Sequence, residues 1–184
     1  ITFQFDFSLD ANDFFTESEP ERRAALVAAG EIVGANLDDT LTAIVPGSLD
    51  PDDTWTATYP NPSTGTVVMT DNLIIPQNVI RVFAGGRNLG STLGVGGPGG
   101  FGVSGATQAW VDTVAGRGQA GALLADPEET DFGPWGGTVT FNTTTNWHFG
   151  IDTAGLGNKE SDFLLVGVHV LYRLICFGSA GFWD

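Results

Sequence analysis

Residues 161–180 read SDFLLVGVHVLYRLICFGSA, and this stretch predicts the element on which the rest of the fold packs. Asn158–Asp162 supplies polar capping residues, and the run Phe163–Phe177 that follows is apolar on nearly every side except at His169 and Arg173. We therefore expect a buried helix over 163–177. The run is shorter than the roughly 20 apolar residues that a bilayer span needs, so no membrane span is expected.

The start of the chain predicts a strand followed by a helix. Ile1–Phe7 alternates apolar and polar residues with period two, which places the apolar side chains on one face of a strand. Ser18–Glu21 then has the pattern of a capping box with an early proline. Behind it, apolar residues recur at helical spacing, namely Leu26, Ala29, Val33 and Leu37. We expect a helix over residues 19–37.

The middle of the chain predicts short strands separated by turns rich in Pro, Asp, Asn and Gly. The expected strands are 41–45, 54–59, 66–69, 73–84 and 138–142, with a short helix over 107–115. Gly85–Gly105 is dominated by glycine and is expected to be a long shaped loop. Together these segments predict one α+β domain over residues 1–184, in which a mixed, twisted sheet carries the early helix and the buried C-terminal helix, with glycine-rich loops.

The C-terminal helix contains the one pattern that points to specific chemistry. A zinc hydrolase helix has two histidines at i and i+4, so that both reach one metal ion, and a glutamate beside the first that activates water. Here His169 stands at the first ligand position, Val170 at the position of the base, and Arg173 at the second ligand position. Arginine is always cationic and does not ligate a divalent metal, so we expect no catalytic residue at these degenerate positions.

Several blocks along the chain carry a family resemblance. Ser161–Leu164 leads into His169, and Phe177–Ala180 is followed by Trp183, which is similar to the motif S-D-F-L-S-V-A-L-H-E-L-G-H-x-L-G-F-G-T-A-x-x-W. Further blocks in the same order are Phe5–Phe7, Arg22–Ala24, Trp55–Ala57, Phe83–Gly86, Gly96–Phe101, Asp131–Gly137, Asn146–Gly150 and Gly155–Gly157. The chain resembles a family of exported bacterial zinc metalloproteases whose members often carry a C-terminal surface-sorting signal.

The resemblance implies a zincin-like fold and a secreted, extracellular or cell-surface protein. The departures at Val170 and Arg173 imply a pseudoenzyme, namely a non-catalytic structural or interaction subunit that binds protein, with self-association by strand addition from the early strand as one mode. The alternative is an active secreted zinc endopeptidase, which requires that the HVLYR segment is misread or that zinc ligands come from elsewhere. His169 alone is expected to be a satisfied core histidine.

The acidic composition limits the kinds of partner and ion that the chain is expected to bind. The formal net charge of −15 repels phosphate backbones, so nucleic acid is not expected as a partner. Asp10, Asn12 and Asp13 are weak candidates for calcium ligands, although they lack the EF-hand spacing. The carboxylate pair Asp52-Asp53 lies in turn-like sequence and is expected to be solvated surface. Cys176 lies among apolar residues and is expected to belong to the core.

Overall fold

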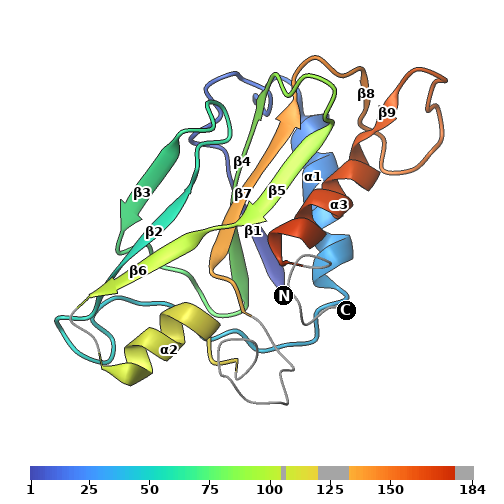
Figure 1. The fold of residues 1–184 in the computed structure, drawn as a ribbon. Helices are drawn as coiled ribbons and strands as arrows, with labels where there is room; N and C mark the ends of the chain where they lie inside the picture. The colour runs from blue at the N-terminus through green and yellow to red at the C-terminus, as the bar shows by residue number, and fades with distance from the viewer. Residues whose placement is uncertain (105–106, 120–132, 177–184) are drawn as a thin grey trace.

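The central sheet of the computed structural model is formed by strands from three distant parts of the chain (Figure 1). In spatial order the strands are β1 (Thr2–Asp6), β4 (Val79–Arg87), β7 (Gly136–Asn142) and β5 (Gly94–Pro98). The first three are parallel to one another, and β5 runs antiparallel to β7. The expected α+β class with a mixed sheet is confirmed. The structure describes residues 1–104, 107–119 and 133–176.

Two helices cover one face of this sheet. Helix α1 (Pro20–Gly34) packs against helix α3 (Phe163–Leu174), and α3 also contacts β5 and β7 (Figure 1). The helices cross closely, because a Cβ added at Gly167 would lie 3.1 Å from the Cβ of Ala29. Between helices and sheet lies the larger core, which includes Leu26, Val33, Val82, Phe141, Phe163 and Leu171.

A second, antiparallel sheet packs on the other side of the central sheet. Its strands, in order, are β3 (Val67–Asp71), β2 (Thr54–Pro60) and β6 (Gly100–Ser104), and the short helix α2 (Gln108–Gly116) lies beneath it. The ring of Tyr59 on β2 stacks on Phe83 of β4 with centroids 4.1 Å apart, which joins the two sheets. A further short parallel pair, β8 (Trp147–His148) and β9 (Ser161–Asp162), precedes α3.

The prediction that Gly85–Gly105 is a loop is wrong. β4 continues to Arg87, and β5 and β6 both lie within this stretch. Glycine is required at Gly96 in β5 and at Gly99 between β5 and β6, because other groups approach the backbone closely there. A Cβ at Gly96 would lie 2.3 Å from the carbonyl oxygen of Val170, and one at Gly99 would lie 2.0 Å from the indole of Trp135. β5 and β6 therefore have few side chains, so the alternation of apolar and polar residues that identifies a strand is not visible in their sequence.

Other boundaries differ from those expected. Helix α1 begins at Pro20, and its N-cap Glu19 makes no side-chain capping bond, so the predicted capping box does not form. Of the expected strand 41–45, only Ile44 pairs, through a single bridge to Ile75. β4 begins at Val79, after Asn78, whose φ of 58° breaks the expected strand 73–84. Helix α3 ends at Leu174, and Phe177 lies outside the described residues.

None of the described helices combines the length and the apolar character that a membrane span requires.

A fully buried arginine ties the second half of the chain to the first. Arg117 follows α2 with φ of 54° and is 0% exposed. Its guanidinium donates to four backbone carbonyls, namely those of Thr42 (2.5 Å), Val79 (2.8 Å), Pro76 (2.9 Å) and Pro134 (3.5 Å). Burial lowers the pKa of Arg117 to about 10. The planar fork thus satisfies carbonyls in the segments that lead into β4 and β7.

We predict that Arg117→Lys lowers the free energy of unfolding by about 2–4 kcal/mol, because one ammonium cannot satisfy carbonyls that the five-donor guanidinium reaches. Urea denaturation measures the change. The matched control is Arg173→Lys on the exposed face of α3, which should stay within about 0.5 kcal/mol of the wild type. Equal stability of the two variants would contradict the role of Arg117.

Candidate functional site

The three positions that match the zinc helix lie on two sides of α3, with His169 and Arg173 on one side and Val170 on the other. The helix begins at Phe163 because the carboxylate of Asp162 accepts the N–H of Leu165 at 3.0 Å. His169 and Arg173 lie one turn apart on the exposed face, together with Leu165, which is 67% exposed. The expectation that His169 is a core histidine is therefore wrong, and α3 is buried on one side rather than on nearly every side.

Val170 lies on the buried side of the same helix. Its side chain is 1% exposed and belongs to the larger core. β5 crosses α3 at this point: a Cβ added at Gly94 would lie 3.2 Å from the Cγ1 of Val170, and Gly96 faces the Val170 carbonyl. The position that a catalytic glutamate occupies in the resembled motif is thus filled by a side chain in apolar contact beneath a strand.

The remaining candidate ligands are dispersed. Within residues 1–104, 107–119 and 133–176, no group of three His, Cys, Asp or Glu side chains is arranged to hold a metal ion. His148 lies with its Nδ1 3.8 Å from a carboxylate oxygen of Glu160, and its Nε2 is 3.1 Å from the carbonyl oxygen of Asp152. His148 therefore holds together the ends of the segment between β8 and β9. The absence of zinc chemistry stays a prediction.

Cys176 follows α3 in a left-handed conformation, with φ of 65°. Burial raises the pKa of its thiol, and the positive charge of Arg173 lowers it in part. The net shift is upward, so the thiolate that reacts with electrophiles is scarcer at neutral pH than for an ordinary cysteine. Cys176 is intermediate in exposure, so it lies at the edge of the core to which the sequence assigned it.

The three candidate calcium ligands hold the N-terminal loop in place. The carboxylate of Asp10 accepts the N–H of Phe15 at 2.6 Å through Oδ2 and that of Gly86 at 3.0 Å through Oδ1. The amide of Asn12 donates to the carbonyls of Ser63 and Gly86. Asp13 is exposed, with φ of 53°. These contacts tie the loop to β4, and calcium binding by these residues stays a prediction.

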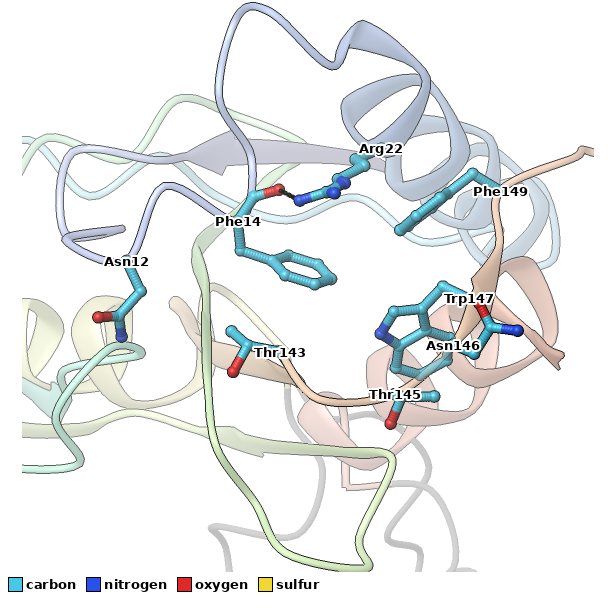
Figure 2. A pocket seen from close by; sticks show the side chains of 8 residues that line it. All are labelled: Asn12, Phe14, Arg22, Thr143, Thr145, Asn146, Trp147 and Phe149. Atoms are coloured by element: carbon cyan, nitrogen blue, oxygen red, sulfur yellow. Dashed lines mark hydrogen bonds between the residues drawn. The ribbon is translucent and has the colours of Figure 1, made fainter. Parts of the chain in front are cut away.

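A pocket that the sequence did not predict lies at the end of α1 nearest this loop. Its volume is about 360 Å³, and it is lined by Asn12, Phe14, Arg22, Thr143, Thr145, Asn146, Trp147 and Phe149 (Figure 2). The walls come from two segments more than a hundred residues apart in the chain, which meet because β7 and α1 lie on the same core. The spacing of residues within either segment does not predict that the two segments lie side by side.

Arg22 closes one side of the pocket. Its guanidinium donates to the carbonyl of Phe14 at 2.9 Å (Figure 2). The same guanidinium forms an ion pair with Glu19. It also lies 5.1 Å from the ring centroid of Phe14 and 5.3 Å from that of Phe149. The charge of Arg22 is thus balanced by a carboxylate and two aromatic faces, which favours a structural role for this side chain.

No protein-family model, curated protein or solved structure matches this chain.

We predict that Val170→Glu, which introduces the glutamate of the resembled motif, lowers the free energy of unfolding by about 3 kcal/mol or more, because it buries a carboxylate in apolar contact. Thermal and urea denaturation measure the loss. His169→Ala, one residue away on the exposed face, is the control and should change stability by less than about 0.5 kcal/mol. A Val170→Glu variant as stable as the wild type would mean that this position faces an open groove.

We predict that alkylation of Cys176 by iodoacetamide follows a pH profile whose midpoint lies above that of an ordinary thiol, because burial raises the pKa. Arg173→Ala removes the charge that lowers this pKa and should move the midpoint further upward. Arg87→Ala serves as the control for the loss of a positive charge elsewhere. A midpoint at or below that of free cysteine, or a downward shift in Arg173→Ala, would refute the assignment.

Proposed function

We propose that this chain is a non-catalytic, metalloprotease-like extracellular domain that acts by binding protein, with self-association by strand addition as its mode. The non-catalytic character of the domain is supported by where the motif positions lie on α3. Val170 is packed beneath β5, whereas the cation of Arg173 stands at the second ligand position, in the open. Neither residue has the chemistry of the group it replaces.

The extracellular location rests on the resemblance to exported metalloproteases, and the acidic composition is compatible with it. The competing function is a secreted zinc endopeptidase. It requires a second histidine and a base that are not at positions 173 and 170 of this sequence. His169 is exposed and accessible, so it is the residue at which zinc would have to bind.

The edge that supports strand addition is β3 rather than the early strand. β1 already pairs in parallel with β4 of its own chain. In the described part of the chain, β3 has β2 as its one strand neighbour, and Figure 1 shows β3 at the outer left edge of the molecule. Val67 and Met69 on β3 are each 70% exposed. Exposed apolar edge strands are the segments that pair with other chains.

A second copy of this chain is the partner we favour for this edge. An antiparallel pair centred on Met69 places Val67 opposite Asp71 of the other copy, so no two carboxylates face each other. Val67–Thr70 carries no charge, and the carboxylate of Asp71 accepts the hydroxyl of Thr56 at 2.6 Å. Two molecules with a net charge of −15 each therefore meet there with little local repulsion.

Metal and protease assays separate the two functions. We predict that the purified chain holds no stoichiometric zinc after incubation with the metal and removal of excess, and that it cleaves no casein or mixed peptide library. His169→Ala should give the same result as the wild type in both assays. Stoichiometric zinc that is lost in His169→Ala, together with peptide cleavage, would establish the endopeptidase instead.

Light scattering coupled to size exclusion tests self-association. We predict a mass that rises with protein concentration and with salt, since salt screens the repulsion between acidic copies. Met69→Lys should abolish this rise, whereas Leu165→Lys, at a comparably exposed apolar position on α3, should not. A monomer at all concentrations and salt levels, or equal effects of the two substitutions, would contradict the assignment to β3.

A further inference from the structure

The carboxylate of Asp53 is buried with one of its oxygens unsatisfied. The residue is 1% exposed, so the expectation of solvated surface is wrong for Asp53, whereas its neighbour Asp52 is exposed as expected. Its Oδ2 accepts the N–H of Asp50 at 2.9 Å, but its buried Oδ1 has no hydrogen-bond donor among the described residues. None of the ion pairs among the described residues involves Asp53. A buried carboxylate oxygen without a partner is costly and calls for a bound cation or water.

The segment around Asp53 is folded into a closed loop, residues 45–53. The N–H of Gly47 donates to the carbonyl of Asp53 at 3.1 Å, and the N–H of Asp53 donates to that of Asp50 at 3.0 Å. The carboxylate of Asp50 accepts the N–H of Asp52 at 3.0 Å. Hydrogen bonds to the main chain and to Oδ2 of Asp53 thus close the loop, which holds three acidic residues within four positions.

We propose that the 45–53 loop binds a calcium ion, with Oδ1 of Asp53 as its buried anionic ligand. Calcium accepts carboxylate and carbonyl oxygens in irregular arrangements, whereas magnesium demands octahedral geometry and keeps its waters, which suits a buried oxygen poorly. Because no group of three acidic, His or Cys side chains among the described residues is arranged for a metal, carbonyl oxygens of the loop and solvent complete the shell.

This site differs from the one expected at Asp10, Asn12 and Asp13. Both carboxylate oxygens of Asp10 already accept backbone N–H groups, whereas Asp53 has one oxygen left over. With one buried carboxylate and mostly neutral ligands, the affinity falls in the range of extracellular calcium modules, on the order of 10⁻⁴–10⁻³ M. The inference is independent of the proposed function, because it involves neither α3 nor β3.

Two tryptophans provide a direct readout. Trp55 is two residues beyond Asp53, and the indole N–H of Trp110 donates to the carbonyl of Thr54 at 3.1 Å. Terbium occupies calcium sites and emits when excited through a nearby indole. We expect saturable terbium emission from the wild-type chain on tryptophan excitation, and we expect calcium to displace the terbium more effectively than magnesium.

Asp53→Asn should weaken terbium and calcium binding at least about tenfold, because it removes the anionic ligand. Asp112→Asn is the control: it removes the same charge from the exposed face of α2, two residues from Trp110, and should leave the affinity within about twofold. Equal binding by Asp53→Asn and the wild type, or no saturable emission from the wild type, would overturn the proposal and leave water as the partner of Asp53.

A second measurement on the wild-type chain covers the case in which Asp53→Asn does not fold. Calcium titration followed by amide NMR should shift resonances of residues 45–55 first and most. Shifts confined to other acidic segments, such as residues 10–13, would overturn the assignment of the ion to this loop.

Discussion

The crossing of β5 over α3 is the contact on which the arrangement of the larger core depends. At Gly96 the strand lies so close to the Val170 carbonyl that no side chain fits between them. This close approach fixes which side of α3 is buried, and with it the rotation of the helix about its axis. Val170 and Leu171 then face the core, and His169 and Arg173 face away from it. Helix geometry places His169 and Arg173 on one face and Val170 about 100° around the axis, and the packing against β5 decides which of these sides is buried.

The two sheets and the segments between them are joined by contacts of different kinds. Aromatic stacking between Tyr59 and Phe83 links the sheets through side chains, whereas Arg117 links backbone segments through its guanidinium. Both depend on complete burial, because stacked rings and carbonyl-bound guanidinium groups contribute most where water is excluded. Asp53 and Arg117 are both buried, but their hydrogen bonding differs. Backbone carbonyls accept the hydrogen bonds of the Arg117 guanidinium, whereas only one carboxylate oxygen of Asp53 has a hydrogen-bond donor among the described residues.

The sequence was informative where side chains carry the periodicity. Period two in residues 1–7 and helical spacing behind Pro20 predicted β1 and α1, and the polar residues before Phe163 predicted the start of α3. It was uninformative where glycine replaces side chains, as in β5 and β6. It was misleading for Asp53 and gave no expectation for Arg117, because the partners of both side chains are backbone groups that the residue types do not predict. The pocket of Figure 2 was missed because its two segments meet only through the tertiary fold.

We infer that α3 is a packing helix whose motif positions cannot act together on a metal. The decisive experiment is a crystal structure of the chain grown with zinc, with anomalous data collected at the zinc edge. We expect Val170 beneath Gly94 and Gly96, the side chains of His169 and Arg173 in solvent, and no anomalous peak that joins His169 to a second protein ligand. An ordered zinc ion bound by His169 and another residue of the chain would contradict this inference.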